Sequence, residues 1–358
     1  MNGSIGKQFL KEYIESSKPI ISAFLTEEIN KIKEFGEISV KLLESFREMA
    51  AEGKGIRGAL TVLGYQIFGG EDLVEIRRTS TFLEIFHAGI LVQDDFMDRD
   101  DIRRGLPTIH KRFEKVGKDV MVRIPFDHYG NSVALCLSDA ALYLSWKILL
   151  SSNLPRELVI NAGSIYANYI VRLAFGQSLD LTVTGMEDYK EDDVLKVIWT
   201  KSGEYTGLLP LMVGAALAGG KDSQKLENIK NYARCFGWAF QIQDDILGLY
   251  ADEEKLGKPV GSDLREGKNT LFMLYLRKNG TQPQKKFQSR ILGNKDITKE
   301  DVKKMRRMLK DSGSYQHVVD MGWKYVEEGK KYVPLITNDK KLAEILESLL
   351  VYMMERTK

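Results

Sequence analysis

Residues that interrupt helices or cross-link chains are rare in this sequence. Its 8 prolines are spread far apart over 358 residues, and because proline breaks a helix interior, long helices have room to form. The 2 cysteines, Cys136 and Cys235, lack any CxxC or Cys/His spacing. They are typical of buried thiols in a reducing compartment, not of a zinc site or a disulfide framework. Alternating Val/Ile/Thr runs bounded by tight-turn dipeptides are also scarce, which argues against a β-sheet protein.

An excess of charge of either sign is missing as well. The chain has 52 basic and 50 acidic residues, so we expect no nucleic-acid partner, because binding to nucleic acid needs a strongly basic surface. The most continuous apolar stretch, Leu208–Gly220, is shorter than the roughly 20 residues that cross a bilayer. Residues 1–19 mix acids with bases around no apolar core, unlike a signal peptide. We therefore expect a cytoplasmic protein with no membrane span.

Apolar residues recur at three- and four-residue spacing along nearly the whole chain, which is the period of an amphipathic helix. Helices are expected over residues 7–34 (with a break near Pro19), 38–51, 56–68, 72–98, 131–151, 155–182, 193–219, 222–251, 269–278 and 299–355. Residues 99–107 and 115–130 are expected to be irregular, and Lys278–Lys286 is expected to link helices. This pattern predicts an all-α fold with a single domain, residues 1–358, built as one large helical bundle.

Two short segments repeat the order apolar, Gln, Asp, Asp, apolar, apolar: Val92–Met97 and Ile242–Leu247. Apolar neighbours indicate that these aspartates lie on buried helices, where a carboxylate needs a cation partner. Asp94 and Asp98 are one helical turn apart on one face, so both can bind one magnesium ion, which takes few protein carboxylates and keeps positions for phosphate and water. An EF-hand is excluded because Phe96 occupies a ligand position.

Basic residues that can complement these acidic clusters occur in several places. Lys54 and Arg57 lie in a glycine-rich helix start, where free backbone amides favour anions. The others are Arg103, Arg104, Lys201, Lys258 and Lys268. Each alone is more often a surface residue, just as the acidic pair Asp192-Asp193, with its charged neighbours, indicates an exposed helix start. Together with the two acidic clusters, the basic residues predict a site for two diphosphate groups.

These residues resemble the motifs of the trans-isoprenyl diphosphate synthases, the family of farnesyl and geranylgeranyl diphosphate synthases. The matching segments are, in chain order, Gly53–Arg57 (similar to GKxxR), Asp94–Asp98 (the first DDxxD), Arg103–Thr108 (RRGxPT), Phe240–Leu247 (FQxxDDxxD), Gly257–Thr270 (the lysine loop) and residues 355–358 (the basic C-terminus). The resemblance covers nearly the whole chain and keeps the family's order, so it is specific.

The resemblance implies an isoprenoid-synthase type of bundle around a central cavity, in a homodimer, that joins isopentenyl diphosphate head to tail to an allylic diphosphate (dimethylallyl, geranyl or farnesyl). It implies two or three magnesium ions held by Asp94, Asp98 and Asp244, which with Lys201 would be the catalytic residues. Isopentenyl diphosphate would be held by Lys54, Arg57, His87 and Arg104. The allylic diphosphate and the reacting centre would contact Arg103, Lys201, Lys258, Lys268, Ser202, Tyr205, Phe240 and Gln241.

Three positions depart from the family pattern. Gly248 stands where the second motif ends in aspartate, Gly58 stands where the GKxxR motif continues with proline, and Ser202 replaces a threonine while keeping the hydroxyl. The glycine at 248 removes one expected contact to a metal. We expect Asp244 to suffice there, with Asp263 assisting.

Product length depends on the helix that precedes Asp94. Phe86 lies about 12 Å before Asp94 along a helix, where it could form the floor of a chain pocket. Ile90 would line this pocket and Gly89 would leave its near wall open. Such a floor suits a product of about C15–C20, and we favour geranylgeranyl diphosphate. Phe86 as a plain core residue is an equal alternative.

Two other functions stay open on the sequence. A class I terpene cyclase shares the fold class and the first motif, but it needs no second diphosphate site. A non-catalytic subunit of a heteromeric synthase tends to lose acidic or basic site residues, and here nearly all are present.

Overall fold

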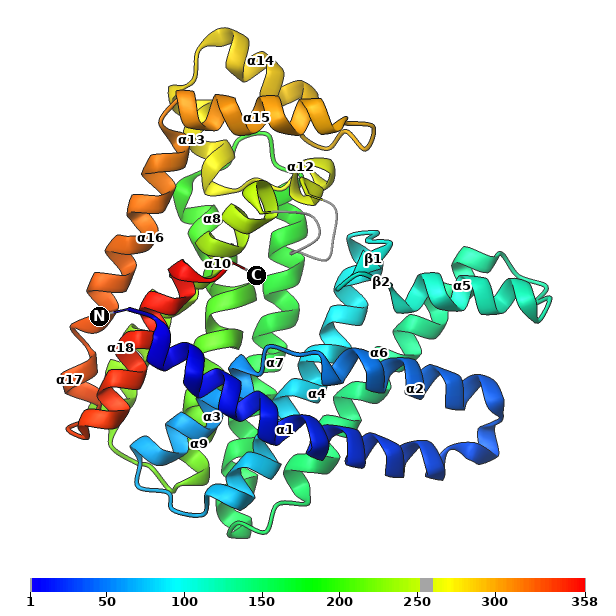
Figure 1. Cartoon of the computed structure of the whole chain (residues 1–358), viewed down its shortest axis with the longest axis vertical. Coiled ribbons are helices and arrows are strands. Elements are labelled where there is room, and N and C mark those ends of the chain that lie inside the picture. The colour runs from blue at the N-terminus through cyan, green and yellow to red at the C-terminus, as the bar shows by residue number, and fades with distance from the viewer. Residues whose placement is uncertain (1, 252–259, 358) are drawn as a thin grey trace. The chain divides into compact units, whose positions relative to one another are not determined.

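Helices make up nearly all of the regular structure in the computed structural model, which describes residues 2–251 and 260–357 (Figure 1). The helices are α1 (Ser4–Lys31), η1 (Lys33–Phe35), α2 (Glu37–Ala51), α3 (Ile56–Ile67), α4 (Leu73–Met97), α5 (Ile109–Asp119), α6 (Phe126–Leu150), α7 (Arg156–Thr184), α8 (Glu191–Val197), η2 (Ile198–Leu208), α9 (Leu209–Leu217), α10 (Ser223–Tyr250), α12 (Ser262–Glu266), α13 (Leu271–Asn279), α14 (Gln282–Ile291), α15 (Lys299–Asp311), α16 (Ser314–Lys330), α17 (Val333–Ile336) and α18 (Lys340–Glu355). Within the described ranges, the only strands are β1 (Ile102–Arg103) and β2 (Leu106–Pro107). The predicted all-α class is confirmed.

The chain divides into two compact units. The first, called here the N-terminal unit, is Gln8–Ser164 with Pro210–Gly220. In it α4 packs against α3 and α6, and α6 also packs against α5. The α4 sequence is apolar on most sides, and accordingly Phe82, Leu83 and Ile85 are fully buried. Glycine lets α9 approach α3 closely, since a methyl group on Gly214 would overlap the backbone of α3.

The second, called the C-terminal unit, comprises residues 1–7 and 165–209 and the described part of 221–358. Its centre is α10, which packs against η2, α16 and α18. The α10 helix starts at Asp222, whose side chain accepts the backbone N–H of Lys225 (3.0 Å) and so satisfies a first-turn amide. Tyr232 and Phe236 fill the core under this helix. A methyl group on Gly237 would overlap the backbone of Gly203, so α10 and η2 meet at two glycines.

Several of the expected boundaries are wrong, and the helix expected over 299–355 is divided into α15, α16, α17 and α18. Pro19 does not break the first helix but lies inside α1. The expected irregular segment 115–130 is mostly helical, because α5 continues to Asp119 and α6 begins at Phe126. The single helix expected over 193–219 is α8, η2 and α9, with η2 wound as a π-helix. Most of the expected linker Lys278–Lys286 lies in α13 and α14, and the Thr281 capping box starts α14.

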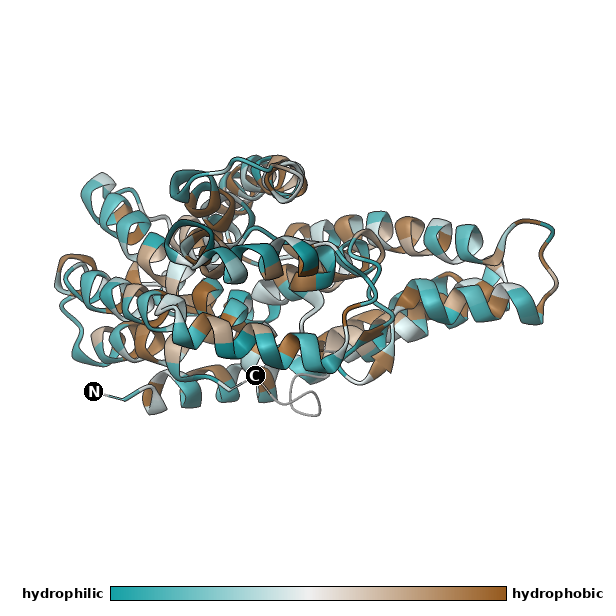
Figure 2. Ribbon diagram, turned by 90° about the horizontal axis from the view of Figure 1, so that it is seen from above, coloured by the Kyte–Doolittle hydropathy of each residue, from teal (hydrophilic) through white to brown (hydrophobic). Residues whose placement is uncertain are grey.

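Hydrophobic and hydrophilic residues alternate around most helices, as amphipathic packing requires (Figure 2). Two helices, α6 and α7, are long and apolar enough to cross a membrane, judged by length and composition only. Core helices of other proteins also meet these two criteria. The apolar side chains of α6 and α7 include several that are exposed, namely Leu135, Tyr143, Leu150, Ile160, Val171, Phe175 and Leu181.

Candidate active site

The first acidic cluster lies at the C-terminal end of α4 in the N-terminal unit. Asp94 and Asp98 are partly exposed, and the Asp98 N–H donates to the Asp94 carbonyl (2.8 Å), so the two residues are one turn apart as the spacing predicts. Asp95, between them, is fully buried and accepts a hydrogen bond from Nε of Arg103. Burial raises the pKa of Asp95 to about 7 even though Arg103 opposes the shift.

The β1–β2 hairpin brings two arginines to this cluster. Arg103 pairs with Asp95 and lies 3.7 Å from the Asp100 carboxylate. Arg104 has φ of 53°, in the left-handed region, and its Nη1 donates to the Met49 carbonyl at the end of α2 (2.9 Å). The two consecutive arginines therefore contact different neighbours: Arg103 contacts the acidic cluster, and Arg104 contacts the segment that precedes α3.

The predicted isopentenyl diphosphate residues lie together around His87. Burial holds the pKa of His87 well below its ordinary value, and the positive charges of Arg57, Arg104, Arg103 and Lys54 lower it further. The imidazole is therefore neutral at neutral pH. Arg103 is paired with Asp95, which leaves Lys54, Arg57 and Arg104 as the cations near this neutral histidine that can favour a multiply charged anion.

The second acidic motif lies on α10 in the C-terminal unit. Ser202 Oγ, on the π-helical η2, donates to Gln241 Oε1 (2.7 Å), and Gln241 Nε2 donates to Asp245 Oδ1 (2.9 Å). Burial, and then the nearby negative charge of Asp263, raises the pKa of Asp245 well above its ordinary value. The close approach of α10 and η2 thus brings the predicted residues Ser202 and Gln241 into direct contact, and Tyr205 is buried on η2.

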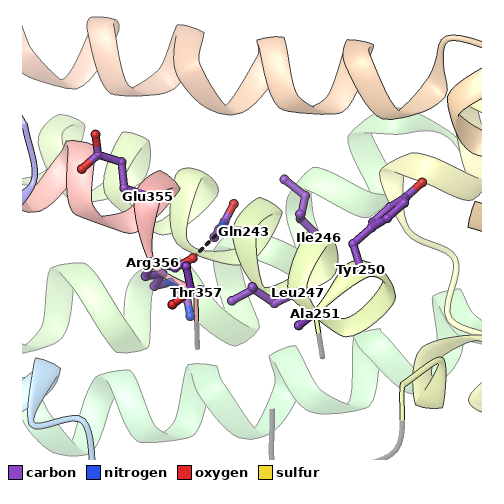
Figure 3. A pocket seen from close by; sticks show the side chains of 8 residues that line it. All are labelled: Gln243, Ile246, Leu247, Tyr250, Ala251, Glu355, Arg356 and Thr357. Carbon is purple, nitrogen blue, oxygen red and sulfur yellow. Dashed lines mark hydrogen bonds between the residues drawn. The ribbon is translucent and has the colours of Figure 1, made fainter. Parts of the chain in front are cut away.

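Asp244, the predicted metal ligand of this motif, is paired with Arg356 near the C-terminus. Arg356 Nη2 donates to Asp244 Oδ1 and to the Phe240 carbonyl (both 2.7 Å), and its guanidinium lies 4.4 Å from the centroid of the Phe240 ring. Gln243 Nε2 in turn donates to the Arg356 carbonyl (2.7 Å) beside a pocket of about 260 Å³ (Figure 3). Arg356 is only 3% exposed. Arg356 was not among the predicted site residues, although the resemblance of residues 355–358 to the family's basic C-terminus pointed to this segment.

Asp263 occupies the space left by the missing aspartate at position 248. A methyl group on Gly248 would lie 2.9 Å from Asp263 Oδ2, so the carboxylate lies directly against the position where a side chain on residue 248 would start. The backbone supports this approach, since the Gly261 N–H donates to the Gly248 carbonyl (3.0 Å) just before α12 begins. Lys268 Nζ lies 3.9 Å from Asp263 and 2.6 Å from Glu266.

The remaining predicted residues are placed as follows. Lys201 Nζ donates to Asp180 Oδ2 (2.6 Å) within the C-terminal unit, and Lys258 lies outside the described residues. Phe86 is buried on α4. Gly89 does not leave an open wall, because a methyl group there would lie 2.6 Å from Ala141 Cβ of α6. The glycine therefore permits close packing of α4 on α6, where Ser138 Oγ donates to its carbonyl (3.0 Å).

The donors suit magnesium that is shared with a diphosphate. Across residues 2–251 and 260–357, no group of three or more His, Cys, Asp or Glu side chains could hold a metal ion by itself. Asp94 and Asp98 instead offer two carboxylates on one face, and Asp244 and Asp263 both lie close enough to influence the charge of Asp245. Magnesium is commonly bound by one or two carboxylates plus phosphate oxygens and water, so these residues fit it.

The helical fold, the two aspartate motifs and the basic cluster together define a diphosphate-handling protein of the isoprenoid-synthase type. The family model described as polyprenyl synthetase matches residues 40–309, and the chain belongs to this family. The chain is 30% identical to a geranylgeranyl diphosphate synthase of Saccharolobus solfataricus (94% of this chain, 98% of that one) and 28% identical to one of Sulfolobus acidocaldarius (98% and 97%).

A solved structure supports the same assignment. It is a geranylgeranyl pyrophosphate synthase of Corynebacterium glutamicum complexed with isoprenyl diphosphate and magnesium, which superposes with a TM-score of 0.90 at 25% identity and covers 97% of this chain and 99% of that chain. The predicted family and its all-helical fold are both confirmed.

Proposed function

We propose that this protein is a magnesium-dependent prenyltransferase. It condenses isopentenyl diphosphate head to tail with an allylic diphosphate (dimethylallyl, geranyl or farnesyl), releases diphosphate and makes geranylgeranyl diphosphate. The observation that carries this proposal is the group of Lys54, Arg57 and Arg104 near neutral His87, in the same unit as the Asp94/Asp98 face. An acidic face and a separate basic cluster correspond to two diphosphates, one bound through metal and one bound directly.

Lys54, Arg57, His87 and Arg104 bind the isopentenyl diphosphate in this proposal. Arg57 is buried and Lys54 is exposed. The charge of Arg57 is therefore held in place by its surroundings, while the side chain of Lys54 can move onto the ligand. Neutral His87 donates a hydrogen bond without adding a fourth positive charge to those of Lys54, Arg57 and Arg104. This arrangement orients the second substrate before any bond breaks, which is a large part of what a two-substrate enzyme must do.

The resemblance assigns Asp94, Asp98 and Asp244 to the allylic diphosphate, which they would bind through two or three magnesium ions. Magnesium held there would neutralise the charge that develops on the leaving diphosphate as the allylic carbon–oxygen bond breaks. The resemblance also assigns Lys201, Lys258, Lys268 and Arg103 to this diphosphate, where they would add positive charge. Arg103, held by Asp95, has a defined orientation for this role, while Lys201 must exchange its contact with Asp180 for one with the ligand.

The reacting carbons need a dry, apolar surrounding, because water would capture the allylic cation. Phe240 and Tyr205 are buried and supply such walls. Ser202 and Gln241, hydrogen-bonded to each other, line the reacting centre. The proton lost after carbon–carbon bond formation goes to the departing diphosphate, so the chain needs no dedicated base.

Two alternatives are less well supported by the same residues. A class I terpene cyclase has no use for the basic cluster around His87, because it binds a single diphosphate. A non-catalytic subunit would be expected to lack acidic or basic site residues, whereas Asp94, Asp98 and Asp244 are all present. The names of the similar proteins, geranylgeranyl and geranylfarnesyl diphosphate synthases, favour the synthase.

We further propose that the whole chain acts as one functional domain, as a cytoplasmic homodimer. The exposed apolar side chains of α6 and α7, such as Tyr143 and Phe175, suit burial against a second copy of the chain. Sedimentation of the purified protein tests this, and a monomer at micromolar concentration would contradict it.

A direct assay tests the function. The purified protein is incubated with magnesium, radiolabelled isopentenyl diphosphate and each allylic diphosphate, and the products are sized after dephosphorylation. We expect a C20 product, and we expect Asp94→Ala and Asp244→Ala to reduce turnover by orders of magnitude with the fold intact. The control is Asp192→Ala, at the exposed start of α8, which should keep full turnover. Cyclic hydrocarbons, or no incorporation at all, would contradict the synthase proposal.

A further inference from the structure

Glu84 is a buried carboxylate on α4 to which the proposed reaction assigns no role. It is 5% exposed, and its Oε1 accepts the backbone N–H of Gly58 (2.8 Å). The backbone of Arg57 also donates to it. These are the second and third residues of α3, and Gly55 before that helix offers no side-chain cap. First-turn amides need an acceptor, and here a neighbouring helix supplies it.

The charge of Glu84 is matched to the basic cluster. Burial raises its pKa, while the Gly58 amide and the guanidinium groups of Arg57 and Arg104 act in the opposite direction. In its ionised form, Glu84 offsets part of the mutual repulsion of these cations. It also draws Arg57 and the first turn of α3 toward α4.

Tyr13 of α1 holds the other side of the same turn. Its hydroxyl hydrogen-bonds Ser80 Oγ (2.9 Å), one helical turn before Glu84 on α4, and the side chain is buried. A methyl group on Gly58 would overlap the Tyr13 hydroxyl, and one on Gly55 would lie 2.9 Å from Tyr13 Cδ1. Residue 58 must therefore have an N–H for Glu84 and no side chain toward Tyr13. Proline, which the related motif has at this position, meets neither requirement.

We propose that Glu84 is a positioning residue of the isopentenyl diphosphate site. By fixing the amides of Arg57 and Gly58 against α4, it sets where Lys54 and Arg57 present their charges, and Gly58 with Tyr13 replaces the stiffness that proline would give. This inference rests on the proposed function, because isopentenyl diphosphate is the ligand concerned.

The first experiment compares Glu84→Gln with Glu75→Gln in steady-state kinetics. Glu75 is a matched control, since it is a buried glutamate of α4 whose partners are Arg78, Ser152 and Asn153, not the basic cluster. We expect Glu84→Gln to raise KM for isopentenyl diphosphate about tenfold, a loss of about 1.4 kcal/mol of binding. Its kcat and its KM for the allylic diphosphate should stay within about twofold of wild type. Glu75→Gln should leave all three constants unchanged while lowering the melting temperature.

A second set of variants isolates the Gly58 amide. Gly58→Ala should raise KM for isopentenyl diphosphate because the new methyl group displaces Tyr13. Adding Tyr13→Ala removes that overlap and should bring KM back toward the value of Tyr13→Ala alone. In the same Tyr13→Ala background, Gly58→Pro should stay impaired, because only proline lacks the N–H that Glu84 accepts.

The outcomes separate the inference from the function on which it rests. If wild type incorporates isopentenyl diphosphate and Glu84→Gln has the same KM as Glu75→Gln, the positioning role is overturned and the synthase assignment stands. If wild type neither incorporates isopentenyl diphosphate nor binds it in calorimetry, both fall together. A tenfold rise in KM confined to this one substrate supports both.

Discussion

Arg356 Nη2 donates to Asp244 Oδ1 across 2.7 Å, so a buried arginine two residues before the last one fixes an aspartate near the C-terminal end of α10. The same nitrogen donates to the Phe240 carbonyl, four residues before Asp244. The guanidinium thus spans one turn of α10 and binds one carboxylate oxygen, while the carboxylate itself is partly exposed. Residues that orient a metal ligand in this way tune its affinity for the metal.

Arg356→Ala should therefore raise the magnesium concentration needed for half-maximal turnover by about tenfold. Isothermal calorimetry with manganese and inorganic diphosphate measures the metal affinity without catalysis and should show the same loss. Arg306→Ala is the control, because Arg306 also donates to a carbonyl of α10, that of Leu249, but contacts no predicted metal ligand. Equal magnesium requirements in the two variants would refute the orienting role.

Asp263 should act as the third carboxylate of the second motif. Asp263→Ala is expected to lower metal affinity about tenfold, because it removes the carboxylate that lies 2.9 Å from where a side chain at position 248 would begin. Gly248→Asp in the wild-type background should also lower activity, since its Cβ would crowd Asp263. In the double variant, residue 248 of α10 supplies the carboxylate that residue 263 has lost. Turnover of the double variant should therefore be higher than that of either single variant. If the loss of turnover in the double variant equals the product of the losses in the two single variants, Asp263 does not take the place of an aspartate at position 248.

The sequence predicted the elements more reliably than the partners of side chains. Asp94 and Asp98 could be placed on one helical face because their spacing is local. Arg356 and Asp244 are 112 residues apart, and no periodicity brings such residues together. Gly58 was noticed only as a departure from proline, since its reason is the Tyr13 side chain on another helix. The π-helical winding of η2 was missed because its residues have ordinary helix-forming character, and its close contact with α10 at Gly203 and Gly237 is a tertiary property.

The stability of the N-terminal unit should depend on pH through Glu75. Its pKa is lowered from 4.5 to about 2: burial opposes ionisation, but Arg78, Asn153 and Thr79 hydrogen-bond the charged form and outweigh it. The carboxylate therefore stabilises the fold fully above about pH 4.5, and this contribution is lost as the pH falls toward 2. Glu75→Gln should lower the free energy of unfolding by up to about 3 kcal/mol at pH 7. Urea titrations at pH 7, 4 and 3 should show that the difference in unfolding free energy between variant and wild type becomes smaller as the pH falls. A difference that is constant with pH would contradict an ionised Glu75 paired with Arg78.

Phe86 should set the product length if it forms the floor of the chain pocket. The next large side chain one turn before it on α4 is Phe82, so removing the Phe86 ring moves the floor by about 5.4 Å. That distance has room for about one more C5 unit, and Phe86→Ala should shift the product from C20 toward C25.

The change also empties part of a packed core, at a cost of about 3–5 kcal/mol, so the milder Phe86→Leu should be sized in parallel. Phe113→Ala is the matched control, because Phe113 is a fully buried phenylalanine in the same unit that belongs to α5 and not to the helix that leads to Asp94. It should lose similar stability and keep the C20 product. An unchanged product distribution in both Phe86 variants would mean that Phe86 is an ordinary core residue. The chain pocket would then have to end elsewhere, because close packing against Ala141 closes the wall at Gly89.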